Sequence, residues 1–142
     1  MNLEAQWIVG FVDSVGEFHI SLKGDEVLPK FSVVRKAKDI HVLYALKTYF
    51  GCGVVRKHHA VRVVYYVRDV KHLIHIIVPF FEKHLLKTSK RIEFQNFRKI
   101  LLIMYKGGHL SPEEFEKIRA LKAKIDHRQT KIESDFIGND RE

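Results

Sequence analysis

The sequence lacks the features that define several common protein classes. Cys52 is the only cysteine among 142 residues, so no disulfide can form within the chain, and a cysteine-based zinc cluster is disfavoured. The longest apolar runs, 73–81 and 100–105, are too short to cross a bilayer, and His75 interrupts the first. We therefore expect a packed thiol at Cys52 and no membrane-spanning segment.

The N-terminus also lacks the positive charge and the long apolar core of a signal peptide. This indicates an intracellular protein, whether in the cytoplasm, a nucleoid or an organelle. Hydrophobic residues make up 46% of the chain and charged residues 30%, which is typical of soluble globular proteins rather than disordered ones. The length suits one domain with a single core.

Basic residues clearly outnumber acidic ones. Lys and Arg total 25 against 17 Asp and Glu, which gives a formal charge of +8 at pH 7 and a pI near 9.6. Such an excess favours a polyanionic partner, usually nucleic acid, over an acidic small molecule.

The stretch 7–18 organises the rest of the chain. Apolar residues at helical spacing predict a helix over 3–14 that is apolar nearly all round, so we expect partners on both of its faces. Gly10 inside this helix costs about 1 kcal/mol relative to Ala, a cost most simply offset if another backbone approaches closely there. That partner could be a second copy of the same helix.

Two hairpins follow, each with one polar face. Residues 17–23 alternate strictly, and 30–36 return as a second strand after a turn at 24–26. The second hairpin pairs 53–57 with 61–68 around a turn near 58–60. The outward positions of the return strand carry Arg62 and Arg68, so its polar face is basic.

Helices occupy most of the remaining sequence. Asp39 is a predicted N-cap for a helix over 40–51, and a helix over 70–78 should stop before Pro79. A long helix over 90–104 should end at Gly107-Gly108, and Ser111-Pro112 should begin a last helix that runs to about Asp126. We therefore expect an α+β fold with one domain over 1–126 and a polar tail over 127–142.

The segment from Trp7 to Phe18, with Gly10-Phe11-Val12-Asp13 and Gly16, resembles the motif of the LAGLIDADG homing endonuclease family. The order of elements and the segments 31–51, Pro79-Phe80 and around Lys87 extend the resemblance over 3–125. It implies an α-β-β-α-β-β-α homing endonuclease fold with a four-stranded antiparallel DNA-binding saddle and an extra C-terminal helix. A chain with one motif implies a homodimer on a long, pseudo-palindromic double-stranded DNA site. Trp7, Gly10 and Phe11 would lie at the dimer interface.

The resemblance places base contacts on the outward positions of the strands. The implied DNA-binding residues are His19, Ser21, Lys23, Lys30, Ser32, Val34, Arg56, His58, Arg62, Tyr66 and Arg68. Arg and Lys can pair with guanine acceptors, whereas Ser and His are more permissive.

The resemblance also implies phosphodiester hydrolysis with Mg²⁺, held by a carboxylate at the end of each motif helix. That position is Val15 here, beside the backbone carbonyl of Ser14, and valine cannot coordinate a hard cation. Glu17 and Asp13 are the candidate substitutes, although Asp13 better resembles the structural acid of the motif. Lys87 corresponds to a basic residue near the scissile phosphate, and Arg35 to a polar position that helps order the attacking water.

Two main hypotheses follow. The first is a site-specific DNA endonuclease, associated with an intron or an intein, whose activity Val15 impairs. The alternative is a non-cleaving nucleic-acid-binding protein or an RNA-splicing maturase on the same fold, because binding needs no metal. A third, more distant one is an unrelated basic α+β interaction domain.

Overall fold

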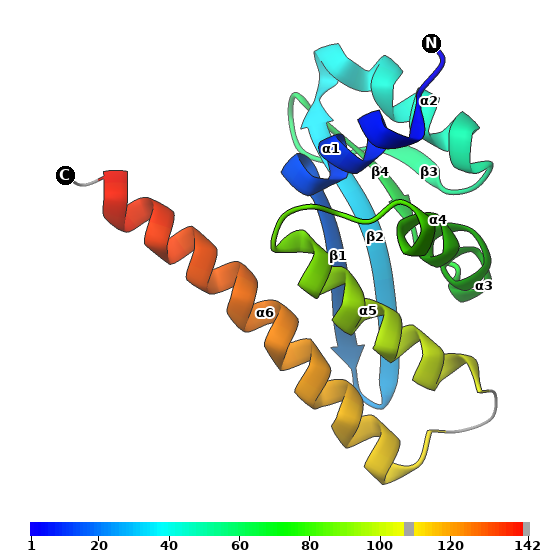
Figure 1. The fold of residues 1–142 in the computed structure, drawn as a ribbon, viewed down its shortest axis with the longest axis vertical. Coiled ribbons are helices and arrows are strands. Elements are labelled where there is room, and N and C mark those ends of the chain that lie inside the picture. Colours follow the sequence, from blue (N-terminus) through cyan, green and yellow to red (C-terminus); the bar gives the residue numbers. More distant parts are fainter. Residues whose placement is uncertain (107–109, 141–142) are drawn as a thin grey trace.

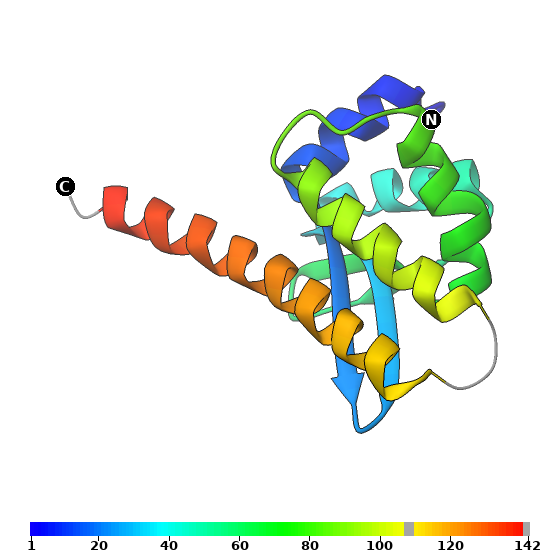
Figure 2. The ribbon, with the colours of Figure 1, turned by 60° about the horizontal axis from the view of Figure 1, so that its bottom comes forward.

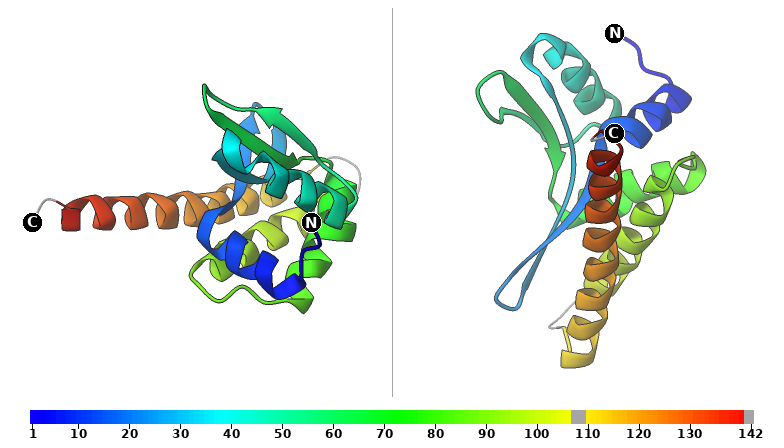
Figure 3. Two further views of the ribbon diagram at one scale, coloured as in Figure 1. Left: turned by 90° about the horizontal axis from the view of Figure 1, so that it is seen from above. Right: turned by 90° about the vertical axis from the view of Figure 1, so that its left-hand side faces the viewer.

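One antiparallel sheet with helices on a single face forms the body of the molecule (Figure 1). The structure, a computed structural model, describes residues 1–106 and 110–140. The strands are β1 (Gly16–Lys23), β2 (Glu26–Lys36), β3 (Val54–Lys57) and β4 (Arg62–Val67), in the spatial order β1-β2-β4-β3. The right-hand view of Figure 3 shows the helices on one side of this curved sheet and the other side open. The predicted α+β class and the four-stranded antiparallel sheet are confirmed.

The strand register confirms the predicted alternation. Phe18 pairs with Phe31, which pairs with Val67, and all three are at most 1% exposed on the helix-covered face. The Phe18 ring lies 5.2–5.7 Å, between centroids, from the rings of four other phenylalanines. These contacts put the core between the sheet and the helices, which leaves the opposite sheet face free for other contacts.

Helix α1 (Ala5–Val15) leads directly into β1, as the sequence predicts. Helix α2 (Ile40–Phe50) follows a short helical turn, η1 (Ala37–Asp39), and ends at Gly51, whose φ of 72° allows the left-handed termination. Asp39 is the N-cap of α2, as predicted, but its side chain does not accept the expected capping hydrogen bond. Its carboxylate forms an ion pair with Arg35 at 3.2 Å instead, so no cap hydrogen bond is made.

The helical segment after β4 does not stop before Pro79. It runs through α3 (Val70–His72), η2 (Leu73–Ile77) and α4 (Val78–Lys83), so the predicted end at 78 is wrong. Residues of η2 are wound as a π-helix, and Pro79 stands in the first turn of α4, where its missing N–H costs least. Asp69 caps the segment, as its carboxylate accepts from the N–H groups of Lys71 and His72.

The two long helices, α5 and α6, follow one another at the C-terminal end of the chain. Helix α5 (Lys90–Tyr105) matches its predicted span, while the predicted stop at Gly107-Gly108 lies outside the described residues. Helix α6 (Pro112–Asp140) begins at a reciprocal capping box, in which the Ser111 N–H donates to Glu114 Oε1 at 3.0 Å and the Glu114 N–H donates to Ser111 Oγ at 3.1 Å. The bond from the Ser111 N–H stabilises the carboxylate and lowers the pKa of Glu114.

The predicted end of α6 near Asp126 is wrong, because the helix continues to Asp140. No proline follows Pro112, and the first glycine after it is Gly138, so the intervening residues supply no strong helix breaker. The C-terminal half of α6 projects away from the sheet, as Figure 2 shows. The division between a domain over 1–126 and a tail stays a prediction.

The remaining expectations concern Cys52 and the membrane. Cys52 is buried, as predicted, and its carbonyl accepts a hydrogen bond from the Tyr65 hydroxyl at 2.9 Å. Burial raises the pKa of both side chains. Among the described helices, none combines the length and the apolar character needed to cross a membrane.

Candidate nucleic-acid interface

Helix α1 presents an apolar surface that the rest of the described chain leaves open. Trp7 is 46% exposed and stacks on Phe11, with ring centroids 4.8 Å apart. Gly10 is exposed on the same side, and a Cβ built there would meet nothing within 4 Å. The close backbone approach predicted at Gly10 therefore does not come from the described part of this chain. The opposite side of α1 is buried in the core through Ile8, Val9 and Val12.

The register of the sheet fixes which side chains share its helix-free face. Ser32 lies between Glu17 and Tyr66 across three strands, and Val34 lies opposite Val64. By the alternation of each strand, this face includes most of the predicted DNA-binding residues: His19, Ser21, Lys23, Lys30, Ser32, Val34, Arg56, Arg62 and Tyr66. His58 and Arg68 each follow the last residue of a strand on this face. Their contacts with DNA stay predictions.

Two of these residues are less open than the sequence suggests. Ser32 is buried although it belongs to the helix-free face. Tyr66 is partly covered, since the Arg68 guanidinium lies 4.6 Å from its ring centroid. Arg68 is therefore held against the sheet by a cation–π contact.

Asp13 joins the end of α1 to the loop that precedes α5. Its Oδ2 accepts the Lys87 N–H at 2.9 Å, while its Oδ1 accepts the N–H and the hydroxyl of Thr88 at 3.1 and 2.8 Å. The Thr88 hydroxyl oxygen in turn accepts the N–H of Lys90 at 3.2 Å. Asp13 therefore positions the start of α5 beside the end of α1, and both of its oxygens are engaged.

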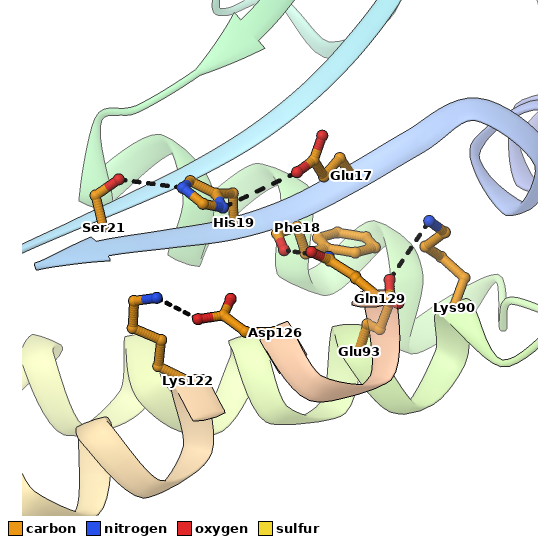
Figure 4. A network of polar contacts seen from close by, with 9 residues as sticks. All are labelled: Glu17, Phe18, His19, Ser21, Lys90, Glu93, Lys122, Asp126 and Gln129. Atoms are coloured by element: carbon orange, nitrogen blue, oxygen red, sulfur yellow. Dashed lines mark hydrogen bonds and ion pairs between the residues drawn. The ribbon is translucent and has the colours of Figure 1, made fainter. Parts of the chain in front are cut away.

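A cavity of about 270 Å³ lies at the end of α1, beside Val15. Residues from three segments separated in sequence line it, and Figure 4 shows most of them. The lining residues are Ser14, Val15, Gly16 and Glu17 from the α1–β1 junction, Lys90 and Glu93 from α5, and Gln129 from α6. The Gln129 amide nitrogen donates to the Phe18 carbonyl at 3.5 Å, so α6 reaches this site beyond its predicted end.

An ion pair faces this cavity. The Lys90 Nζ lies 3.4 Å from Glu93 Oε2, and the side chain of Glu93 is only 2% exposed (Figure 4). This oxygen accepts no hydrogen bond with good geometry from the described residues. Lys90 therefore provides the charge that stabilises a buried carboxylate. Glu17, on the sheet side, is half exposed and lies 3.9 Å from the His19 ring.

The predicted catalytic residues do not all meet at this cavity. Lys87 is exposed and contributes its backbone N–H to Asp13, and it does not line the cavity. Arg35 points to the helix-covered side, where its guanidinium lies 5.9 Å from the Phe11 ring and is bound by Asp39. Their catalytic roles stay predictions.

Sequence reasoning missed the roles of Lys90, Glu93 and Gln129. The spacing of Lys90 and Glu93, three residues apart on a predicted helix, indicates an ion pair. It does not indicate that the pair lies beside Val15, which is far away in the sequence.

The residues at the end of α1 do not fit the predicted Mg²⁺ site. Val15 offers no side-chain ligand, Asp13 is engaged by the loop, and the Lys90 ammonium already neutralises Glu93. Of the two predicted substitutes, only Glu17 lines the cavity, where it provides a single half-exposed carboxylate. Across the described residues, no group of three His, Cys, Asp or Glu side chains could hold a metal ion. A hard divalent cation requires several oxygen ligands, and the described residues of a single protomer do not supply them at the end of α1.

Known proteins share this arrangement. A family model described as LAGLIDADG endonuclease matches residues 8–101, from α1 into α5. The crystal structure of a homing endonuclease, I-TnaI, is 39% identical and superimposes with a TM-score of 0.84, covering 94% of this chain and 99% of that chain. These findings confirm the predicted family and fold.

Two further relatives are larger than this chain. I-SmaMI, solved bound to an uncleaved DNA target in the presence of calcium ions, is 34% identical with a TM-score of 0.86, over 89% of this chain and 46% of that one. A probable intron-encoded endonuclease 2 from Neurospora crassa is 27% identical over 82% of this chain and 26% of its own length. The chain spans about a quarter of the length of this relative and of two other curated ones.

Proposed function

The chain belongs to the LAGLIDADG endonuclease family, and from this premise we propose that it binds a long double-stranded DNA site as a homodimer. Each protomer lays its helix-free sheet face in the major groove of one half-site of a pseudo-palindrome. The scissile phosphates lie near the ends of the two α1 helices. Cleavage is impaired because Val15 stands where the metal-binding carboxylate is expected, and the gene is associated with an intron or an intein.

The distribution of charge on the sheet carries the DNA-binding part of this proposal. Each strand contributes a cationic side chain to the helix-free face: Lys23, Lys30, Arg56 and Arg62. A sheet of this kind fits a groove about 12 Å wide, and its cations displace counterions from the phosphates. We therefore expect an affinity that falls steeply with salt. I-SmaMI, whose DNA complex is solved, supports this reading.

The open face of α1 supports the homodimer. A two-fold axis would bring Trp7, Gly10 and Phe11 of one protomer against the same three residues of the other. Gly10 has no neighbour within 4 Å in its own chain, so the backbone of a second α1 can approach closely there. This chain corresponds to 46% of I-SmaMI, which is consistent with two such units in a complete DNA-binding protein.

The environment of Val15 supports the impaired chemistry. A divalent cation at this position would supply a Lewis acid and an activated water, but the Val15 side chain has no oxygen to hold it. The Lys90 ammonium is the cation that the chain itself directs toward this cavity. In the DNA complex it stabilises the negative charge of a nearby phosphate, an interaction that binds but does not cleave.

The test combines binding and cleavage. The protein and its Val15→Asp variant are incubated with a library of duplexes, with Mg²⁺ or with EDTA, and bound and cut molecules are sequenced. We expect both proteins to retain the same duplexes and only the variant to cut them, with Mg²⁺. No retention of any duplex at low salt would exclude the proposal.

A competition experiment addresses the splicing alternative. Intron RNA and duplex DNA are added together to the protein, and the fraction of each that is bound is measured. We expect duplex DNA to be preferred, because the cations follow a sheet that fits the major groove of B-form DNA, whereas the major groove of an RNA duplex is too narrow. A clear preference for RNA would favour the maturase hypothesis.

A further inference from the structure

The helix-free face of the sheet is not uniformly basic. Near the β1–β2 turn, His19 lies opposite Lys30, and near the other end Lys36 lies opposite Arg62. Between these two zones the register brings together three valines, which we call the valine cluster, and one cation, Arg56 of β3, lies opposite Val64 at the edge of the cluster. Its members are Val34 in β2, Val64 in β4 and Val54 in β3.

The three valines differ in exposure. Val64 is only 7% exposed, whereas Val34 and Val54 are partly exposed on the same face. Val34 lies directly opposite Val64, and Val54 lies opposite Tyr66, one step further along β4. Val64 therefore supports the cluster, and the methyl groups of Val34 and Val54 are the ones available to a ligand.

A valine side chain can recognise only one feature of the major groove. It neither donates nor accepts a hydrogen bond, and the only apolar group on a base edge there is the C5 methyl of thymine. Pressed against a G·C pair, it would remove water from the guanine acceptors without replacing their hydrogen bonds, which is unfavourable. Apolar residues at the centre of a DNA-binding face therefore select for thymine.

We propose that the valine cluster reads the C5 methyl groups of thymines within each half-site, an assignment that rests on the DNA binding proposed above. The spacing of the strand residues gives the position of these thymines. Lys30 and Val34 are four residues apart on β2, which is about 13 Å, or about four base pairs. Lys36 is two residues further, or about two base pairs. The thymines thus lie between two sets of contacts made by basic residues.

The test removes single methyl groups from the DNA. Duplexes that bind the full-length protein are selected from a random library, and each thymine of the best one is replaced in turn by deoxyuridine, which lacks only the C5 methyl. We expect one or two replacements in each half-site to raise Kd about fourfold each, the effect of one buried methyl group. Other thymines should change Kd by less than about twofold.

Two variants assign the effect to the cluster. Val34→Thr keeps the shape of the side chain but replaces one of its two methyl groups by a hydroxyl, and it should lower the thymine-to-uracil ratio of affinities at its position. Val61→Thr is the matched control, because Val61 is 66% exposed in the β3–β4 turn, outside the strands of this face. It should leave the ratio unchanged.

The outcomes separate this inference from the proposed function. If the protein binds duplex DNA but no deoxyuridine replacement changes Kd, the reading of thymine is wrong and the DNA binding stands. If no duplex is bound at all, both are wrong. The deoxyuridine series uses the wild-type protein, so it remains decisive even if Val34→Thr fails to fold.

Discussion

Two regions of helix α1, its exposed side and its C-terminal end, place different demands on the side chains that form them. Its exposed side carries Trp7, Gly10 and Phe11, and an interface there requires only shape and apolar area. Its C-terminal end, at Val15, would require the oxygens of one carboxylate to hold a cation. On the function proposed above, valine at this position costs the metal site and leaves the apolar surface, the loop anchored by Asp13 and the basic sheet as they are.

A carboxylate at position 15 would remove this difference between the two regions of α1. Of the substitutions considered, it has the largest expected effect, which is on cleavage. Val15 is partly exposed beside a cavity of about 270 Å³, so an aspartate fits there without displacing the core. We expect Val15→Asp to raise the rate of Mg²⁺-dependent cleavage of a bound duplex about a hundredfold or more, because a bound cation contributes several kcal/mol to charge stabilisation. Gel electrophoresis of the cut products measures it.

The control for this variant is Val61→Asp. It adds the same charge at an exposed position in the β3–β4 turn, away from the end of α1. Equal cleavage by both variants would contradict a specific role for position 15. Failure of Val15→Asp to gain Mg²⁺ affinity, measured by calorimetry, would show that its missing carboxylate is not what limits the site.

A larger side chain at Gly10 tests the other end of the comparison. A Cβ there meets nothing within its own chain, so Gly10→Leu should leave the protomer folded. In a two-fold dimer, both copies would overpack the interface, at a cost of roughly 2–6 kcal/mol in total. We expect the dimer to dissociate at micromolar concentration, as measured by analytical ultracentrifugation.

Two substitutions calibrate that result. Gly10→Ala should stabilise the helix of the free protomer by about 1 kcal/mol, since alanine favours the helix over glycine. Ala123→Leu places the same leucine side chain on an exposed position of α6 and should leave the oligomeric state unchanged. A monomer from the wild-type chain would argue against the interface on α1.

The Lys90–Glu93 ion pair at the cavity beside Val15 gives the next, smaller expected effect, which is on stability. Lys90→Met leaves the Glu93 carboxylate, 2% exposed, without the ammonium at 3.4 Å, and we expect it to lower the free energy of unfolding by about 3 kcal/mol. Adding Glu93→Gln removes the buried charge and should recover much of that loss. Urea unfolding of both single variants and the double variant measures the coupling. An additive double variant would show that the two side chains do not interact.

The sequence predicts what depends on local periodicity and turn chemistry. Alternation in 17–23 identifies the buried face of β1, and Ser111 with Glu114 forms the capping box that their spacing indicates. It does not predict contacts chosen between distant segments. The approach of Lys90 and Glu93 to Val15 depends on how α5 packs, and the same holds for the absence of Lys87 from the residues that line the cavity.

Some errors have a specific physical cause. Asp39 has the residue type of a cap, but a nearby Arg35 competes for its carboxylate and prevails. A proline normally ends a helix. Pro79 does not, because it follows the π-helical residues 73–77 and lies in the first turn of α4. In both cases the preference of one residue type is overridden by its surroundings, an ion-pair partner for Asp39 and the π-helical segment for Pro79.

Substitution of Asp13 has the smallest expected effect on stability. It tests whether the C-terminal end of α1 and its exposed side depend on the same contacts. Asp13→Ala removes three hydrogen bonds to Lys87 and Thr88, and we expect the free energy of unfolding to fall by about 2 kcal/mol. Since these bonds fix the start of α5 beside α1, amide hydrogen exchange should accelerate at 87–90, whereas the dimer affinity should be unchanged because the exposed face of α1 is untouched. The control Ser14→Ala alters the neighbouring exposed residue, whose side chain makes none of these three bonds. A fall in dimer affinity with Asp13→Ala would mean that the loop, and not only the surface of Trp7, Gly10 and Phe11, contributes to assembly.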